Sequence, residues 1–598
     1  MQFRKIHASL AVMMLAIAMP VAGSQAAAVT ISDITLDAAP VYTLSVPSVV
    51  AVDANIDEAT IRALLTDLPG HTADLAKLSA TSLTIPELTT TQAVRASGNL
   101  PAATGTIVFR NIALNGVVNG VASSASIGSI SVTDTNKSDV ELGATTVSKL
   151  NIAALLGFFG LVDRPASDER EVLYNDFKFA GGTYTAQLTP VDCKIGPIAI
   201  AEFKARPLKM TMAEIGALMS QSPQTRTPAD VSALIRLYAG TLTAFESSPI
   251  TFGGLDCSGK DLGQDVRLAT GAVDIDGITP GSYPRITLTN PSMEIAGTGH
   301  IRADSLTVKA IDFTNSIKVM LMGDPLLDNN EIAQHSRELM PALGGFAVEG
   351  LDIDMLINSG DRTSAKVASL DVSLADYLNG IPTTISTSGD HVVVDLAQYS
   401  QASALKDLGI KTLDLTYALK AKWDSASNTI NVDNFSVDGV DLGSFAMSGA
   451  LTNATASLFS SDNAEQRAGL TELGLRSLAV KVEDKGLWQR IVAKVGMEQG
   501  QTPDQLRTRT SGMAQGVALF YLGGTAEAQA LSQALGAFIT GEASRLSIKL
   551  DAKSPAGLGF IDLATLQTKP ARLGQLVTIT GEASGGPAPQ ADAQKDQN

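Results

Sequence analysis

Histidine side chains are the commonest carriers of acid–base and zinc chemistry in proteins, so their spacing is the first question to ask of this sequence. Behind the first 26 residues the histidines lie far apart from one another and from both cysteines, at His71, His300, His335 and His391. A zinc site usually takes at least two ligands a few residues apart. We therefore interpret these histidines as isolated surface residues, with a zinc site or a histidine base assembled by the tertiary fold as the alternative.

The glycine motifs of familiar enzyme classes are absent. The sequence contains no Gly-x-Ser-x-Gly turn for a nucleophile, no phosphate-binding loop and no dinucleotide-binding glycine pattern. Trp423, Trp488 and Phe520 lie on apolar stripes and are interpreted as core anchors instead of a ligand platform. The absence of these motifs argues against hydrolase and nucleotide-dependent chemistry. We assign no catalytic residue and no cofactor.

Pairs of carboxylates recur beside glycines. The pairs are Asp274 with Asp276, Asp352 with Asp354, and Asp438 with Asp441. Carboxylates two residues apart on a strand point to the same face, where they could share Ca²⁺. No pair has the spaced oxygen ligands and closing glutamate of a calcium loop. We interpret them as the solvated faces of strands and assign no metal, with a shared Ca²⁺ as the alternative.

Two cysteines, Cys193 and Cys257, both follow the N-terminal segment. In an oxidising compartment we expect them to form a disulfide, which would close a loop worth about 4 kcal/mol in the chain-entropy estimate. Two separate buried thiols are the alternative.

Residues 1–26 predict a signal peptide. Arg4 and Lys5 precede the apolar run Ala8–Met19, and small residues follow Pro20. The apolar run is too short to span a bilayer, and no later run approaches the length of about 20 apolar residues that a spanning helix needs. We therefore expect a protein without a transmembrane span after signal cleavage, in the periplasm or outside the cell.

The elements that would position any site are mostly strands. From Leu413 to Trp423 every second residue is apolar, which is the period of a strand with one wet face. Turn-forming residues follow at 424–428, and the apolar alternation resumes at Ile430 with a slip in phase before Phe435. This pattern predicts a long antiparallel hairpin.

The same reading along the chain predicts an α+β fold dominated by β structure. We expect long curved antiparallel sheets of repeated amphipathic strands, with helical inserts packed on one face, in two similar halves. The N-terminal half is placed at 27–270 with inserts at 148–162 and 212–245. The C-terminal half is placed at 271–584 with an insert at 485–540, followed by a disordered tail at 585–598.

Composition limits the partners. The net charge of −17 argues against nucleic acid, because phosphate contacts need lysine and arginine in excess. At 598 residues the chain is too long for one core.

The alternating strands at 413–423, 430–442 and 473–482 give the chain an architectural resemblance to the AsmA-like and related repeating-β-groove envelope proteins of Gram-negative bacteria. The resemblance covers about 250–480 and, less closely, 100–200, and it includes no diagnostic motif. It implies a curved sheet whose apolar inner face holds acyl chains. The sequence departs from that family in lacking an uncleaved N-terminal anchor helix.

A sheet that is apolar on one face must cover that face with another layer, a helix or a lipid. We therefore predict an exported, non-enzymatic envelope protein that binds lipid or another hydrophobic ligand on an apolar β surface. The helices at 212–245 and 485–540 would remove the groove if they covered that surface. The alternative function is a structural or interaction scaffold for an envelope protein partner in the periplasm or at the cell surface, without a ligand.

Overall fold

The structure is a computed structural model. It describes residues 27–587 apart from gaps at 39–41, 95–102, 136, 163, 166, 188–189, 209, 211–214, 216–217, 219–225, 262, 323–334, 357–361 and 400–401. The predicted signal peptide and most of the predicted tail lie outside the described residues. The fold is β-dominated and antiparallel with several helices, as the sequence predicts.

The chain forms two compact units. Unit 1 comprises residues 1–297 and 310–333, and unit 2 comprises residues 298–309 and 334–598. The division therefore falls later in the chain than the predicted boundary at 270/271. Residues 298–309 belong to unit 2, whereas residues 310–333, which follow them, belong to unit 1. The strands of both units pair antiparallel; β1–β5 of unit 1 and β24–β31 of unit 2 pair in the order of the sequence.

Unit 1 begins with five long strands, each paired with the next: β1 (Ala28–Ala38), β2 (Tyr42–Val52), β3 (Ala80–Val94), β4 (Ala103–Val118) and β5 (Val121–Asp134). Between β2 and β3 lie α2 (Glu58–Thr66), η2 (Leu68–His71) and α3 (Thr72–Leu75). The N-cap of α2 is Asp57, whose carboxylate accepts a hydrogen bond from the Thr60 amide.

Each of these strands interrupts its apolar alternation at the same level. Two residues, one of them at positive φ or a proline or glycine, separate two buried apolar residues that are three apart and share a face; the pairs are Ile31/Ile34, Val46/Val49, Ile85/Leu88, Phe109/Ile112 and Ile127/Ile130. Asp33 and Asn111 take the left-handed conformation at this point, with φ of 56° and 53°. The pairing register continues past these positions without a shift, so neighbouring strands make the same change together and their apolar side chains stay on one face.

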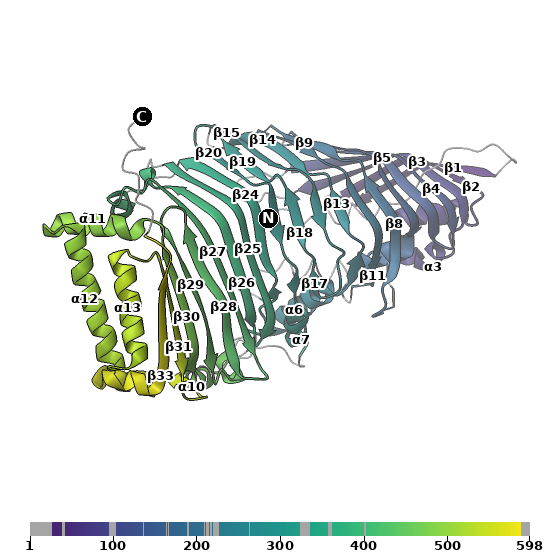
Figure 1. Ribbon diagram of the computed structural model, residues 1–598. Helices are drawn as coiled ribbons and strands as arrows, with labels where there is room; N and C mark the ends of the chain where they lie inside the picture. Colours follow the sequence, from purple (N-terminus) through teal and green to yellow (C-terminus); the bar gives the residue numbers. More distant parts are fainter. Residues whose placement is uncertain are drawn as a thin grey trace. The chain divides into compact units, whose positions relative to one another are not determined.

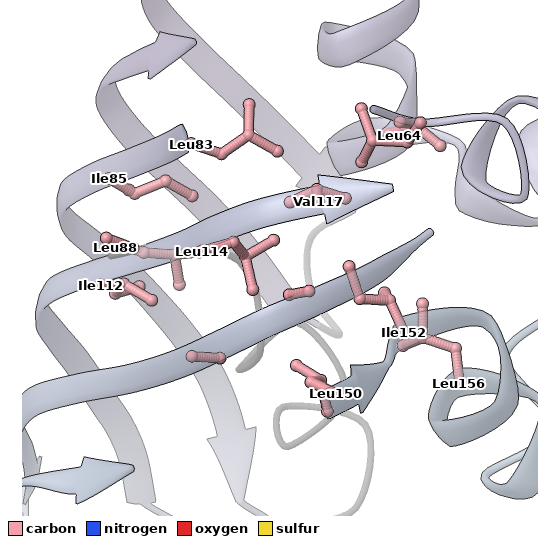
Figure 2. Packing of buried hydrophobic residues seen from close by; sticks show 14 of the residues in the cluster. Leu64, Leu83, Ile85, Leu88, Ile112, Leu114, Val117, Leu150, Ile152 and Leu156 are labelled. Atoms are coloured by element: carbon pink, nitrogen blue, oxygen red, sulfur yellow. The ribbon is translucent and has the colours of Figure 1, made fainter. Parts of the chain in front are cut away.

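The core of unit 1 lies on that face. Side chains from α2, β3, β4, β7 (Thr145–Asn151) and α4 (Ile152–Phe158) meet there, among them Leu64, Leu83, Leu114, Leu150 and Leu156 (Figure 2). The predicted helical insert at 148–162 is thus wrong at its start. Residues up to Asn151 belong to β7, because Val147 pairs with β5 in the sheet, and the Asn151 side chain then caps α4.

Beyond β5 the strands of unit 1 are broken in the middle, so the sheet runs as two tracks. One track follows β6 (Ser138–Leu142), β9 (Gly182–Ala186), β10 (Val191–Ile195), β14 (Leu255–Asp261), β15 (Gln264–Thr270) and β19 (Ser292–Ile295). The other follows β7, β8 (Glu171–Phe179), β11 (Ile198–Ala205), β12 (Phe245–Ser247) with β13 (Ile250–Phe252), β16 (Val273–Ile275) and β18 (Ile286–Thr289).

Glycines mark the breaks between the two tracks. The amide of Gly143 donates to Gly181 O over 2.7 Å, and that of Gly196 donates to Gly254 O over 2.7 Å. A Cβ on Gly196 would lie 2.4 Å from the carbonyl carbon of Gly253, so backbones approach more closely here than any side chain allows.

The described part of unit 1 contains two further helices. The predicted insert at 212–245 contains α6 (Pro228–Leu242), which begins with a capping box formed by Thr227 and Asp230; much of 211–225 lies outside the described residues. Helix α7 (Thr314–Met320) contacts α6. The short strands β17 (Ser282–Tyr283) and β22 (Ile311–Asp312) pair with each other.

Unit 2 continues as a meander of long strands, seen as the green to yellow part of Figure 1. The strands β20 (Gly299–Arg302) and β21 (Ser305–Val308) both pair with β24 (Gly345–Leu356). The order then follows the chain: β25 (Arg362–Leu378), β26 (Ile381–Asp395), β27 (Thr412–Asp424), β28 (Thr429–Gly439), β29 (Gly443–Thr452), β30 (Gly474–Asp484), β31 (Arg545–Ala552) and β33 (Val577–Ser584). Two short strands also lie here, β23 (Ala342–Leu343) and β32 (Leu558–Gly559).

The predicted insert at 485–540 consists of three helices: α11 (Leu487–Gln499), α12 (Pro503–Leu522) and α13 (Ala526–Thr540). Thr502 and Gln505 form the capping box that their spacing predicts. The remaining helical segments are η4 (Leu396–Gln398), α9 (Ser403–Lys406), η6 (Ala456–Phe459), α10 (Asn463–Glu472), α14 (Phe560–Thr568), η7 (Pro570–Arg572) and α15 (Leu573–Leu576).

Candidate functional site

One face of the unit 2 sheet is apolar from strand to strand. Tyr417 of β27 pairs with Val437 of β28, which pairs with Phe445 of β29, which pairs with Val482 of β30. Polar residues occupy the alternate positions and therefore the opposite face. We call the face that carries these four residues the apolar face.

The phase slip seen in the sequence before Phe435 is a bulge. The register of β28 with β29 shifts between Val432 and Phe435, and the intervening Asp433 and Asn434 are exposed. The register of β26 with β27 shifts in the same way between Gly389 and Val392. These bulges keep the apolar residues of the unit 2 strands on one face.

The middle of the apolar face has no covering layer. In the described parts of β24–β30, no apolar side chain is fully buried; Leu370, Tyr417, Phe435, Met447 and Val480 are all half-buried. The strands β1–β5 of unit 1 give the contrast, because many of their apolar residues are fully buried in a core shared with α2, α3 and α4. The predicted apolar face therefore exists and, between its ends, stays in contact with solvent.

The ends of the apolar face are covered. At the end of β27, Trp423 packs against Phe459 of η6 with ring centroids 4.8 Å apart. Along the last strands, α13 lies on β31 and β33, where Leu531 approaches so closely that a Cβ on Gly581 would be 2.4 Å from its Cδ1 atom. Helix α13 therefore covers the final strands and leaves the middle of β24–β30 open.

A cavity of about 380 Å³ lies where α11 meets the sheet. Its floor is the end of the apolar face, with Leu415, Val437, Phe445 and Val482. Its other walls come from Leu487, Trp488 and Ile491 of α11 and from Phe538 of α13. This volume falls in the usual range of ligand pockets, about 300–1,000 Å³.

Three polar side chains around the cavity are hydrogen-bonded within the protein. The Trp488 indole N–H donates to Ile539 O over 3.0 Å. The Asp484 carboxylate accepts hydrogen bonds from the amides of Gly486 and Trp488, each over 3.0 Å, and so fixes the start of α11. Glu483 accepts a hydrogen bond from Arg545 Nε over 2.8 Å. The lining of the cavity is almost entirely apolar, so the cavity suits apolar groups.

The sequence indicated part of this cavity, since the stripe Leu487, Trp488 and Ile491 on α11 was recognisable. It was interpreted as core, but the structure places it on a cavity wall. Leu442 and Phe538 also line the cavity and had no distinguishing sequence signal. Only the pairing of β27, β28 and β29 with α11 overhead brings these residues together.

Cys193 and Cys257 lie directly opposite each other on β10 and β14 and form a disulfide. The pair lies in unit 1 on the face that carries Ile195 and Leu255, with Tyr184 and Leu268 as the next residues across the sheet. Leu268 is 51% exposed, so this part of the unit 1 face is open to solvent as well.

Each of the four histidines is next to a carboxylate. The distances are 2.9 Å for His71 to Asp74, 3.4 Å for His300 to Asp352, 3.0 Å for His335 to Glu338 and 3.1 Å for His391 to Asp414. These pairs lie on different elements, and the described residues contain no cluster of histidine, cysteine and carboxylate groups that could hold a metal ion.

The paired carboxylates face cations from neighbouring strands. Asp276 lies 3.2 Å from Arg285, and Asp438 lies 2.7 Å from Lys485. Asp354 accepts two hydrogen bonds from Arg362, which hold the pKa of that carboxyl below its usual value. Their geometry fits cross-strand ion pairs on the solvated face.

A family model described as "Uncharacterized protein" matches residues 436–584, which include the second half of β28, the strands β29–β31 and β33, and α11–α13. No curated protein and no solved structure matches the chain. No helix among the described residues is both long enough and apolar enough to cross a membrane.

Proposed function

We propose that this protein binds a lipid or another extended hydrophobic ligand on the apolar face of unit 2. The single observation that carries the proposal is the uncovered stretch of β24–β30, where side chains such as Tyr417, Phe435 and Met447 stay half-buried. An apolar surface held in contact with water is costly unless a ligand or partner removes it.

The proposal places the protein outside the cytoplasm, in the cell envelope. The predicted signal peptide at 1–26 supports export. The Cys193–Cys257 disulfide supports it independently, since such bonds persist in oxidising compartments. The function proposed is binding, without catalysis, because no group around the cavity is arranged as a nucleophile with a base.

The experiment compares two single variants of the purified protein by mass spectrometry of co-purified lipids. Met447→Asp places a charge on the apolar face, and Ser448→Asp places the same charge on the opposite face of the same strand. We expect the wild type and Ser448→Asp to retain lipid and Met447→Asp to lose most of it. A wild-type protein free of lipid, and unable to take up added phospholipid, would contradict the proposal.

A second candidate function is a scaffold for a protein partner, and one observation favours it. Large apolar side chains are strongly exposed on α12 and α14, with Phe520 63%, Phe560 67% and Ile561 81% exposed. Such residues mark interaction surfaces. Phe520→Ser with Ile561→Ser would weaken a partner complex and leave lipid retention unchanged, whereas Met447→Asp would do the reverse.

A further inference from the structure

The cavity under α11 differs chemically from the rest of the apolar face. The open face offers one wall to a ligand, whereas the cavity adds a second wall from Leu487, Trp488 and Ile491 of α11 and Phe538 of α13. A group that enters the cavity therefore loses more of its contact with water than a group on the open face.

The nearby polar groups make the cavity suitable for one part of a ligand only. The indole N–H of Trp488 and the carboxylates of Glu483 and Asp484 are already hydrogen-bonded within the protein. The lining of the cavity is almost entirely apolar, so a hydroxyl, amide or carboxylate placed inside would cost free energy on losing water. A hydrocarbon segment would bear no such cost.

From this geometry we infer that the cavity receives the methyl end of a long hydrocarbon chain, with the polar end of the ligand outside on the open face. The inference rests on the proposed function and adds to it the ligand class, an amphiphile with a long acyl chain, and its direction. The floor of the cavity is continuous with the open face through the paired residues Tyr417, Val437 and Phe445, so a chain can lie along both.

The protein has two tryptophans, and they report on the two ends of the apolar face. Trp488 lines the cavity. Trp423 lies on β27 eight residues beyond Leu415, which is roughly 26 Å along a strand. Its indole N–H donates to Ala454 O, and its ring packs on Phe459. Each tryptophan can be isolated by changing the other to phenylalanine.

The test uses bromine, which quenches tryptophan fluorescence on contact. Delipidated full-length Trp423→Phe and Trp488→Phe are each titrated with palmitic acid brominated on its last two carbons, and with the isomer brominated next to the carboxylate. Calorimetric titration with unlabelled palmitic acid measures binding in parallel. We expect Trp488 to lose more emission with the methyl-end isomer than with the carboxyl-end isomer.

The possible outcomes separate the inference from the proposed function. Saturable binding with Trp488 quenched equally by both isomers, more strongly by the carboxyl-end isomer, or by neither would overturn the inference and leave the proposed function standing. If calorimetry detects no binding of palmitic acid or of added phospholipid, the proposed function itself fails.

A second pair of variants tests the same point without relying on fluorescence. Val437→Phe fills part of the cavity, and Ser436→Phe adds the same ring to the opposite face of β28, at a residue that does not line the cavity. Excluding about two methylenes from the cavity should weaken palmitic acid binding about tenfold. We expect that loss in Val437→Phe and little change in Ser436→Phe; equal effects of the two variants would overturn the inference.

Discussion

The ring of Tyr417 on β27 lies against the backbone of Gly389 on the neighbouring strand β26, so closely that a Cβ on Gly389 would come within 2.4 Å of the Tyr417 Cε1 atom. Gly389 is buried although no helix covers it. On a face without a covering layer, a large side chain gains contact area by lying down on the sheet, and a glycine opposite it supplies the room.

This contact predicts that Gly389→Ala destabilises unit 2. The new methyl group would displace the Tyr417 ring from the face on which it rests, and an overpacked contact of this kind costs about 1–3 kcal/mol. Chemical unfolding followed by the circular dichroism of the strands would show a lower midpoint than that of the wild type.

Gly512→Ala is the matched control. Gly512 lies inside α12, and a Cβ there would meet nothing within 4 Å. Alanine in an open helical position should stabilise the protein by about 0.5–1 kcal/mol. The interpretation of the Tyr417 contact would be wrong if the two variants shifted the midpoint in the same direction.

The alternation of polar and apolar residues was enough to predict strands such as β27, and capping residues predicted α12 at both ends, because these signals are local. The bends were not predicted. A pair such as Phe109 and Ile112, three residues apart, reads as a break in the strand pattern. Its meaning emerges only when Asn111 takes a positive φ and the paired positions of the neighbouring strands, Ile85/Leu88 and Ile127/Ile130, show the same spacing.

The apolar face was also predictable from sequence, but its exposure was not. The periodicity of Leu413–Trp423 requires a cover of some kind, and the helices at 485–540 were an obvious candidate. Which strands those helices cover depends on the close approach of Leu531 to Gly581, which is a long-range contact without a local sequence pattern. The cavity depends likewise on α11 crossing above Val437 and Phe445.

A pH dependence is expected from Tyr174. Its ring stacks on Phe203 with centroids 5.4 Å apart, and burial raises its pKa from 10.0 to about 12. The unfolded chain releases this proton near pH 10 while the folded protein keeps it. The contribution of Tyr174 to the free energy of unfolding is therefore fully present below pH 10 and is lost as the pH rises toward 12. The loss is on the order of 2 kcal/mol.

Tyr174→Phe keeps the ring and removes the titrating group. We expect the unfolding free energy of this variant to fall less steeply between pH 10 and pH 12 than that of the wild type, with little difference between them at pH 8. Parallel curves for the two proteins above pH 10 would show that Tyr174 ionises in the folded state as it does in the unfolded chain.

The disulfide of unit 1 predicts a separate loss of stability. Cys193 and Cys257 are 64 residues apart, and opening such a loop costs about 4 kcal/mol in the chain-entropy estimate. We expect Cys193→Ala with Cys257→Ala to unfold at a lower urea concentration. A thiol assay on denatured, unreduced wild-type protein should find no free thiol, and two free thiols would contradict the pairing.

The packing of α13 on the last strands predicts the effect of a side chain at Gly581. Valine there would collide with Leu531, which lies 2.4 Å from the position of the new Cβ, so α13 must move away from β33. We expect Gly581→Val to destabilise unit 2 by about 1–3 kcal/mol or more and to speed amide hydrogen exchange in α13. Thr580→Val is the control, since Thr580 is exposed on the opposite face and valine favours strands. If both variants left exchange in α13 unchanged, the close contact between Leu531 and Gly581 would not be what holds the helix on the sheet.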